Sequence, residues 1–412
     1  MAKIAVLGYG VVGSGTVEVI YKNKEILEKK AGEALDVKYI LDLRDFPDSP
    51  YADKFTKDFN VILNDPEVTV VAEVIGGIKF SYGYVKSLLE AGKSVVTSNK
   101  ELVAEKGAEL LAIAHQHNVN FFFEASVGGG IPIIRPLHQC LAANEIDDIA
   151  GILNGTTNFI LTKMINEGMG FDEALKMAQE LGYAERDPSA DVEGHDTCRK
   201  ICILASLAFG KHVYPKNIYT EGITKITLED VKYCESFGGA IKLIGWASRR
   251  GSDVAVMTCP AFISGESQLS SVNDVFNAIL VRGDATGDVV FYGKGAGKLP
   301  TASAVVSDII IAVKQKNSSI SLQWEDSDQN FVLDYKNLDN KFYVRLVSDD
   351  KQASLELAEK LFGKLEMLHR DGEAANEAAF ITQAINEQKF EDCCKQLAEV
   401  AEVKGTIRVL NY

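Results

Sequence analysis

Apolar residues in the first third of the chain gather into short runs, and amphipathic stretches separate these runs. The runs cover residues 3–7, 36–43, 68–75, 94–97 and 120–125, and an amphipathic stretch with a helical pattern follows the first of them to about residue 24. Apolar runs of this length are typical of buried strands. Their alternation with helices predicts an α/β fold built on a doubly wound parallel sheet.

The rest of the chain follows other patterns. From about residue 213 to 292 short apolar runs alternate with helical stretches, which predicts an open sheet in an α+β domain. Residues 316–340 are polar and broken, as in a linker. Beyond them, strands at 342–347, 364–369, 378–382 and 406–410 and helices at 355–362 and 391–400 give the order βαββαβ, a ferredoxin-like arrangement. We therefore expect a first domain at 1–130 completed by 293–315, a second at 131–292, the linker at 316–340 and a third domain at 341–412.

Composition narrows the class of protein. A chain of 412 residues with 46% hydrophobic and 25% charged residues suggests a globular, soluble protein of two or three domains. The net charge of −15 without a basic cluster argues against nucleic-acid binding, and no stretch of roughly 18 apolar residues predicts a membrane span. The N-terminus enters a strand pattern at once, which leaves no signal peptide. Seven cysteines without paired spacing indicate reduced thiols, so we expect a cytoplasmic protein.

A glycine-rich turn follows the first predicted strand. Gly8, Gly10 and Gly13 form G-x-G-x-x-G, and Val11 and Val12 begin the helix after it. In this strand–turn–helix setting the pattern is the dinucleotide fingerprint of a Rossmann fold, in which the helix N-terminus receives the phosphates. The sequence therefore predicts a dinucleotide as cofactor.

The end of the second predicted strand bears on which cofactor binds. A carboxylate such as Asp42 would contact the ribose hydroxyls of NAD, whereas an arginine such as Arg44 would accommodate the extra phosphate of NADP. Both residues are present, so both cofactors stay open. The alternative is that Arg44 is a surface residue at the end of the strand with no role in cofactor binding.

Residues 178–200 contain several acidic side chains and a lysine that are candidates for a catalytic or binding site. Acidic side chains crowd the stretch before an apolar helix predicted over 192–209, and we expect Asp191 to be the N-cap of that helix. Asp196 and Lys200 are four residues apart, so they share a helix face and can form an ion pair. The simpler alternative is a capped amphipathic helix with an ion pair at its surface.

The spacing of Ala178, Gly182, Asp187-Pro188, Asp191, Gly194, Asp196 and Lys200 resembles the signature of homoserine dehydrogenases. The resemblance covers about residues 1–315. It implies reversible NAD(P)-dependent reduction of L-aspartate 4-semialdehyde to L-homoserine, a step toward threonine, methionine and isoleucine. It also implies that residues 131–292 bind the substrate and form the contact of a homodimer or homotetramer.

The resemblance assigns roles to individual residues. Lys200 would donate the proton to the carbonyl oxygen, held by Asp196, and Glu185 and Asp191 would bind the ammonium group of the substrate. Lys100, after Ser98-Asn99, would lie near both substrate and nicotinamide, and the resemblance favours NADP through Arg44, with NAD also usable. The further positions that the resemblance implies are Tyr183, Gly155 and Thr156 for substrate and Gly76, Ser98 and Gly297 for cofactor.

The resemblance also suggests roles for the loop 124–132 and for residues 341–412. The loop 124–132 is similar to a monovalent-cation loop, in which Glu124, Val127, Gly129 and Ile131 would offer mainly carbonyl oxygens to sodium or potassium in a structural role. A glycine-rich hinge is the plain alternative, and the two are compatible. Residues 341–412 are similar to an ACT regulatory domain, but the sequence at 350–354 lacks the Pro-Gly pair that is usual in its first turn.

From this departure we expect the third domain to serve mainly in subunit contact and inhibition by threonine to be weak or absent. Two other functions stay open. Another Rossmann amino-acid dehydrogenase would share the glycine fingerprint, and a non-catalytic amino-acid sensor would share the C-terminal pattern but would not need Lys100 or Lys200.

Overall fold

A computed structural model describes every residue except 317, 319, 321, 323 and 327–328. The chain forms two compact units. Unit 1 contains residues 1–145, 202–215 and 293–329, and unit 2 contains residues 146–201, 216–292 and 330–412. Among the described residues, no helix has both the length and the apolar content that crossing a membrane requires.

Unit 1 contains the predicted parallel sheet, with the strand order β3-β2-β1-β4-β5-β6. Its strands are β1 (Ala2–Leu7), β2 (Leu35–Leu41), β3 (Phe55–Thr56), β4 (Val68–Glu73), β5 (Ser94–Thr97) and β6 (Phe121–Phe122). The order reverses between β1 and β4, and ligands of such sheets bind at that reversal, beyond the carboxyl ends of the strands. The doubly wound sheet is therefore confirmed.

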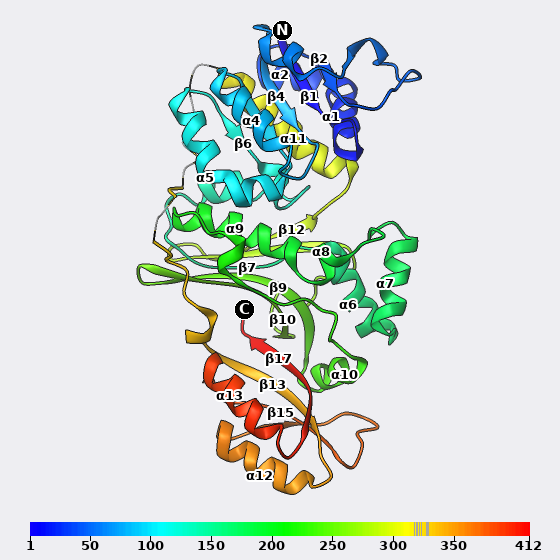
Figure 1. The fold of residues 1–412 in the computed structure, drawn as a ribbon, viewed down its shortest axis with the longest axis vertical. Coiled ribbons are helices and arrows are strands. Elements are labelled where there is room, and N and C mark those ends of the chain that lie inside the picture. The colour runs from blue at the N-terminus through cyan, green and yellow to red at the C-terminus, as the bar shows by residue number, and fades with distance from the viewer. Residues whose placement is uncertain (317, 319, 321, 323, 327–328) are drawn as a thin grey trace. The chain divides into compact units, whose positions relative to one another are not determined.

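Helices cover this sheet as right-handed crossovers require. They are α1 (Val11–Lys22), α2 (Lys24–Ala31), α3 (Phe59–Asn64), α4 (Ser81–Glu90), α5 (Lys100–Gln116) and α11 (Lys298–Lys314). Because the strand order reverses at β1, helices before and after the reversal lie on opposite faces. In agreement, α1 packs against α11, and α4 packs against α5 (Figure 1).

Unit 2 is built on one long mixed sheet, in the order β12-β11-β7-β9-β10-β17-β13-β15-β14. Its strands are β7 (Ile146–Ile152), β8 (Tyr219–Thr220), β9 (Gly239–Arg250), β10 (Asp253–Ser264), β11 (Phe276–Gly283), β12 (Gly287–Lys294), β13 (Asp339–Val347), β14 (Glu366–Leu368), β15 (Glu377–Ile381), β16 (Ile385–Asn386) and β17 (Glu402–Leu410). The expected alternation of short strands and helices over 213–292 is wrong. One helix is followed there by long antiparallel strands, of which β9 and β10 are buried along most of their length.

The helices of unit 2 include a break that the sequence analysis missed. They are α6 (Gly155–Glu167), α7 (Phe171–Glu180), α8 (Ser189–Val192), α9 (His195–Phe209, which continues into unit 1), α10 (Leu228–Ser236), α12 (Lys351–Phe362) and α13 (Glu387–Leu397). Gly194 has a φ of +85° and separates α8 from α9, so the expected continuous helix and the N-cap role of Asp191 are wrong. A Cβ at Gly194 would lie 3.2 Å from the carbonyl oxygen of Glu221, and glycine fits this tight, left-handed position.

The C-terminal segment has the expected element order βαββαβ, with the short β16 added. It is not a separate compact unit, because β17 pairs with β13 on one side and, in parallel, with β10 on the other (Figure 1). Both faces of its sheet are covered. Val344 and Phe380 pack with the apolar residues of α12 and α13, and Tyr343 and Ile381 belong to the core around α6 and α10.

Part of the predicted linker is packed against the rest of the chain. Trp324 is buried, its indole N–H donates a hydrogen bond to His212 over 2.9 Å, and it lies against Gly107. Val332 forms a β-bridge with Val254 of β10. Positions 317, 319, 321, 323 and 327–328 of this segment lie outside the described residues.

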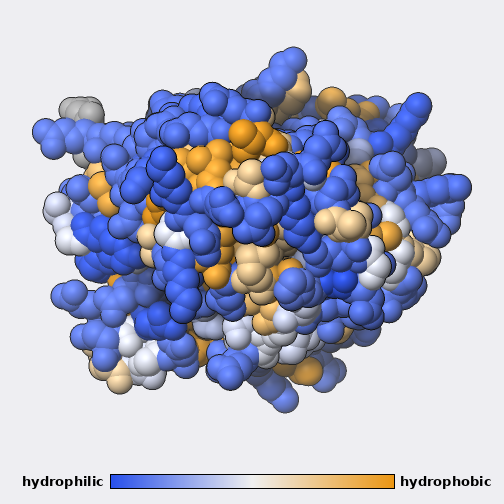
Figure 2. All heavy atoms as spheres, turned by 90° about the horizontal axis from the view of Figure 1, so that it is seen from below, coloured by the Kyte–Doolittle hydropathy of each residue, from blue (hydrophilic) through white to orange (hydrophobic). Residues whose placement is uncertain are grey.

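The face of the molecule in Figure 2 is mainly hydrophilic with a smaller hydrophobic area near its centre.

Candidate functional site

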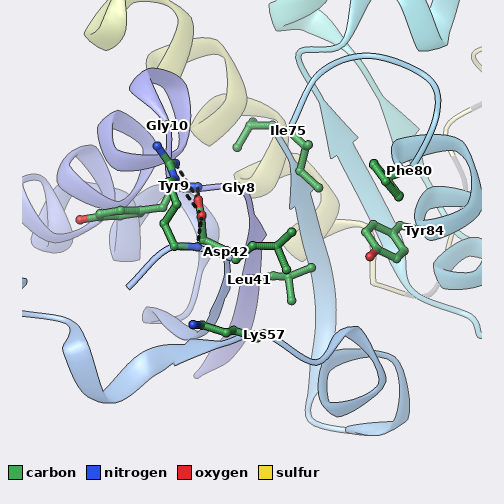
Figure 3. A pocket seen from close by; sticks show the side chains of 12 residues that line it. Gly8, Tyr9, Gly10, Leu41, Asp42, Lys57, Ile75, Phe80 and Tyr84 are labelled. Atoms are coloured by element: carbon green, nitrogen blue, oxygen red, sulfur yellow. Dashed lines mark hydrogen bonds and ion pairs between the residues drawn. The ribbon is translucent and has the colours of Figure 1, made fainter. Parts of the chain in front are cut away.

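A pocket of about 390 Å³ lies at the carboxyl ends of β1, β2 and β4, where the strand order reverses. Gly8 and Gly10 line it, together with Tyr9, Leu41, Val74 and the aromatic side chains of Phe80 and Tyr84 (Figure 3). A Cβ at Gly13 would lie 2.0 Å from the carbonyl oxygen of Gly8, so glycine is required for α1 to approach the turn. A Cβ at Gly10 would meet nothing within 4 Å, which leaves open space beside the backbone at the N-terminus of α1. This cradle fits a pyrophosphate group.

An arginine and a carboxylate meet at the end of β2. The side chain of Arg44 donates hydrogen bonds to both oxygens of Asp42, at 3.0 and 2.8 Å, and the backbone N–H groups of Tyr9 and Arg44 donate two more, at 2.8 and 3.0 Å. These bonds, those from the Arg44 side chain above all, hold the pKa of the Asp42 carboxyl well below its usual range. Arg44 is 63% exposed, and Lys57, which sequence analysis missed, also lines the pocket.

Glu73 organises the turn after β4 and was also missed. Its buried carboxylate accepts hydrogen bonds from the backbone N–H groups of Ile75 and Gly76, from the hydroxyl of Ser81 and from that of Thr97. It therefore fixes the predicted cofactor residue Gly76, whose φ is +86°. A carboxylate at the end of a buried strand, just before paired glycines, was the available signal.

Of the predicted cofactor residues, Gly8, Gly10 and Arg44 line this pocket and the others do not. Val11 and Val12 form the first turn of α1, and Ser98 follows β5. Lys100 is the first residue of α5, whose N-cap is Asn99, and Gly297 is the N-cap of α11 with a φ of +128°.

The carboxylate of Glu124 is not available as a cation ligand. It is buried and accepts hydrogen bonds from the backbone N–H groups of Ile133, Ile134 and Arg135 at 2.6 to 2.9 Å. A cation in this loop would have to rely on main-chain carbonyls, including those of Val127, Gly129 and Ile131. Among the described residues, no group of three or more His, Cys, Asp or Glu side chains is arranged to hold a metal ion.

A buried ion pair lies at the start of α9. Lys200 Nζ is 2.8 Å from Asp196 Oδ2, and the two side chains are 9% and 3% exposed. The predicted pairing is confirmed, and the alternative of a surface ion pair is wrong. Lys200 also donates a hydrogen bond to the carbonyl oxygen of Leu153, over 2.7 Å. The chain just before α6 thus helps to hold the ammonium group.

Asn154, which sequence analysis did not select, joins the two aspartates. Its amide nitrogen donates hydrogen bonds to Asp191 Oδ1 at 2.7 Å and to Asp196 Oδ2 at 2.9 Å. Its amide oxygen caps α6 by accepting from the backbone N–H of Thr157. An Asn before a helix start was the only local signal. Asp191 therefore belongs to a group of side chains on α8, α9 and the start of α6.

Three further predicted substrate residues lie at or beside the start of α6. Gly155 is its first residue, and Thr156 donates a hydrogen bond from its hydroxyl to the carbonyl oxygen of Tyr183 at 2.7 Å. The ring of Tyr183 packs edge-on against Phe159 and is 45% exposed. Glu185 lies on the segment between α7 and α8 and is exposed. Its carboxylate is thus accessible to solvent.

Sequence comparison gives matches along almost the whole chain. Residues 8–124 match the family model "Homoserine dehydrogenase, NAD binding domain", and residues 132–310 match the model "Homoserine dehydrogenase". The homoserine dehydrogenase of Bacillus subtilis is 37% identical, over 99% of this chain and 98% of the relative. That of Synechocystis is 38% identical over 99% of both chains.

Solved structures agree with these matches. The crystal structure of a homoserine dehydrogenase from Thiobacillus denitrificans has a TM-score of 0.91 and 34% identity, and it covers 100% of this chain and 98% of that one. A hyperthermophilic archaeal homoserine dehydrogenase in complex with NADPH has a TM-score of 0.65 and 29% identity, with 76% of this chain and 97% of that one covered.

Proposed function

This chain belongs to the homoserine dehydrogenase family, and from that premise we propose that Lys200, Asp196 and Asp191 carry out its chemistry. The enzyme is an NAD(P)-dependent oxidoreductase acting on a CH–OH group, and it interconverts L-homoserine and L-aspartate 4-semialdehyde. The nicotinamide cofactor supplies or accepts the hydride. The protein must bind the amino acid, orient it and move one proton.

Lys200 is assigned the proton transfer. When hydride adds to the aldehyde, negative charge develops on the carbonyl oxygen, and a neighbouring ammonium group can donate a proton to it. The observation that carries this assignment is the buried ion pair of Lys200 with Asp196, supported by the carbonyl oxygen of Leu153. Both partners favour the charged form of the lysine and fix its position, while the low exposure limits competition from water.

Asp191 and Glu185 are assigned to the ammonium group of the substrate. A carboxylate is the group that pairs with an alkylammonium ion, and Asp191 lies beside Asp196 through its bond to Asn154. Glu185 is exposed on the segment between α7 and α8. The start of α6, with Gly155 and Thr156, would shape the space around the amino acid together with Tyr183, which is hydrogen-bonded to Thr156.

For the cofactor, the glycine cradle and the pocket fit a dinucleotide, and we favour NADP over NAD. The support is chemical. Both oxygens of Asp42 already accept hydrogen bonds from Arg44, so the ribose hydroxyls of NAD would compete with a guanidinium for them. The extra phosphate of NADP would instead attract Arg44 and Lys57. The archaeal relative whose structure contains NADPH is consistent with this choice. Val11, Val12, Gly76, Ser98, Lys100 and Gly297 complete the proposed cofactor contacts.

The loop 124–131 would bind a monovalent cation through main-chain carbonyls only. The side chain of Glu124 is committed to backbone N–H groups, so the site would add no carboxylate charge. Neutral carbonyl ligands suit sodium or potassium better than a divalent ion. The cation would therefore be structural, with no part in the proton transfer.

We also propose that the enzyme is a homodimer or homotetramer in the cytoplasm. Residues 341–412 would form an ACT-like module. Inhibition of the enzyme by threonine at this module would be weak or absent. The start of α12, where the usual Pro-Gly pair is missing, is closed by its own side chains. Asp350 accepts the backbone N–H of Ala353 at 3.0 Å, and the hydroxyls of Ser348 and Ser354 are 2.8 Å apart. Saturable inhibition by submillimolar threonine would contradict this proposal.

The direct test of the proposed function is the change in nicotinamide absorbance when the purified enzyme meets homoserine, with NADP and with NAD in separate assays. We expect oxidation of homoserine with both and a higher kcat/KM with NADP. Absorbance changes with other amino acids but none with homoserine would favour another amino-acid dehydrogenase. No change with any of them would favour a sensor.

A further inference from the structure

The amide of Asn154 uses all of its hydrogen-bonding capacity. The oxygen accepts from the backbone N–H of Thr157 at 2.8 Å and from its hydroxyl at 3.0 Å. The nitrogen donates one hydrogen bond to Asp191 at 2.7 Å and one to Asp196 at 2.9 Å. Asn154 is 5% exposed. A primary amide has two donors and an oxygen with two lone pairs, so both ends are satisfied inside the protein.

The helix cap fixes which way this amide points. The N-cap oxygen must face the free N–H groups at the start of α6, since an amide turned the other way would set its own N–H groups against them. The nitrogen then necessarily faces the two aspartates. The start of α6 therefore determines where the two carboxylates lie, although they are 37 and 42 residues away in the sequence.

We propose that Asn154 is a positioning residue for the dehydrogenase reaction, which sets the places of Asp191 and Asp196 and tunes the proton affinity of Lys200. The inference rests on the proposed function of Lys200. Asp196 Oδ2 receives both the Asn154 amide and the Lys200 ammonium group. The neutral amide brings two donors to a pair of like charges without adding a charge of its own.

The consequence for Lys200 has a definite sign. In homoserine oxidation Lys200 must accept the proton of the hydroxyl group, so turnover rises with pH as the lysine loses its own proton. Without the Asn154 donors the aspartates carry more unscreened negative charge, which stabilises protonated Lys200 and raises its pKa. The ascending limb of the pH profile of kcat then moves to higher pH.

Two substitutions separate this role from the cap. Ser, Asp and Asn are about equally good N-caps, so Asn154→Ser and Asn154→Asp both keep an acceptor for the start of α6. The serine hydroxyl has one hydrogen and cannot serve both aspartates. The ionised carboxylate that Asn154→Asp introduces has no hydrogen to donate and adds a negative charge. The same pair of changes at Asn386, the N-cap of α13, is the matched control.

The experiment measures kcat for homoserine oxidation from neutral to alkaline pH, together with the thermal midpoint of each full-length variant. We expect a thermal midpoint near that of the wild type in Asn154→Ser and a lower one in Asn154→Asp, because the new carboxylate is buried beside Asp191 and Asp196. Near neutral pH we expect both variants to lose kcat on the order of 10²-fold from misplaced groups. The ascending limb should move to higher pH in Asn154→Ser and further in Asn154→Asp, within the roughly 1–3 units that a neighbouring charge produces. The Asn386 variants should match the wild type.

Lys200→Ala, measured in parallel, separates the two levels of inference. If Lys200→Ala keeps wild-type turnover, the proposed role of Lys200 is wrong and the role of Asn154 falls with it. If Lys200→Ala is inactive but both Asn154 variants keep the wild-type pH limb, only the inference about Asn154 is overturned. An equal shift in the Asn386→Asp control would overturn it too, because the limb would then respond to charge anywhere on the protein.

Discussion

Arg345 on β13 donates a hydrogen bond to Asp230 on α10 over 2.9 Å, and the two side chains are only 8% and 1% exposed. The hydroxyl of Tyr343 donates to the same carboxylate at 3.0 Å, and Asp230 also closes the capping box of α10 with Thr227. A residue of the C-terminal segment thus neutralises a buried charge of the middle segment. The two segments depend on each other within unit 2.

Ending the chain near Asn337 should therefore unfold unit 2 instead of releasing a spare module. The truncation removes Arg345 and Tyr343 from Asp230 and takes β17 away from β10.

In the full chain, Arg345→Met should lower the free energy of unfolding by about 3–5 kcal/mol, because it leaves an unpaired buried carboxylate. Denaturant unfolding measures this, with Lys395→Ala as control at the exposed pair with Asp392, where the change should be within about 0.5 kcal/mol. A truncated enzyme with full stability and activity would contradict the expectation.

Lys200→Ala should lower kcat by roughly 10²–10⁴-fold, the usual contribution of a positioned proton donor. KM for the cofactor should change little, because Lys200 is assigned to the reacting oxygen of the substrate. Steady-state kinetics with varied homoserine and NADP give both values. Lys163→Ala is the matched control, since Lys163 also pairs with an acid four residues away, Glu167, but at the surface. Near wild-type turnover in folded Lys200→Ala would remove the proposed mechanism.

Arg44→Ala should penalise NADP by about 1–3 kcal/mol, the range of a lost charge-assisted hydrogen bond. Use of NAD should be unchanged or improved, because the substitution removes the guanidinium that competes with the ribose hydroxyls for the carboxylate of Asp42. The ratio of kcat/KM for the two cofactors measures this, and Lys29→Ala on the exposed side of α2 is the control. Equal losses with both cofactors would mean that Arg44 supports the pocket and does not recognise the phosphate.

His212 should make unit 1 less stable in mild acid. Its Nδ1 accepts a hydrogen bond from Trp324, its Nε2 lies 2.8 Å from the carbonyl oxygen of Ala104, and burial lowers its pKa from the ordinary 6.5. The unfolded chain therefore takes up a proton at this ring, as the pH falls through about 6.5, at a higher pH than the folded chain does. The free energy of unfolding should therefore decrease below about pH 6.5.

Denaturant unfolding at about pH 7.5 and about pH 5.5, on either side of the ordinary histidine pKa, checks this sign. His212→Gln should lose stability at both pH values but should show a weaker decrease between them than the wild type. His369→Gln, at a ring that is 77% exposed, should keep the wild-type decrease. An identical pH dependence in His212→Gln and the wild type would exclude this histidine as the cause.

The sequence by itself determined the nucleotide-binding sheet, the glycine cradle and the pairing of Asp196 with Lys200. Each follows from a short-range pattern: an apolar run of strand length, glycines at fixed spacing beside a strand and a helix, and side chains one helical turn apart. The order of the C-terminal helices and strands could be predicted for the same reason. Local rules failed at the expected cap by Asp191. The cause was the left-handed backbone of Gly194, where the carbonyl oxygen of the distant Glu221 also leaves little room for a side chain.

Only the tertiary structure decided which residues support these groups. Asn154 meets its two aspartates across 37 and 42 residues, and Asp230 meets Arg345 across 115. Whether the ion pair of Lys200 is buried, and whether the last segment is a separate domain, also depends on what packs against each element, such as β10 beside β17. Hydrogen bonds and burial between distant segments leave almost no periodic trace in the sequence, because a single polar residue at the right place suffices to form them.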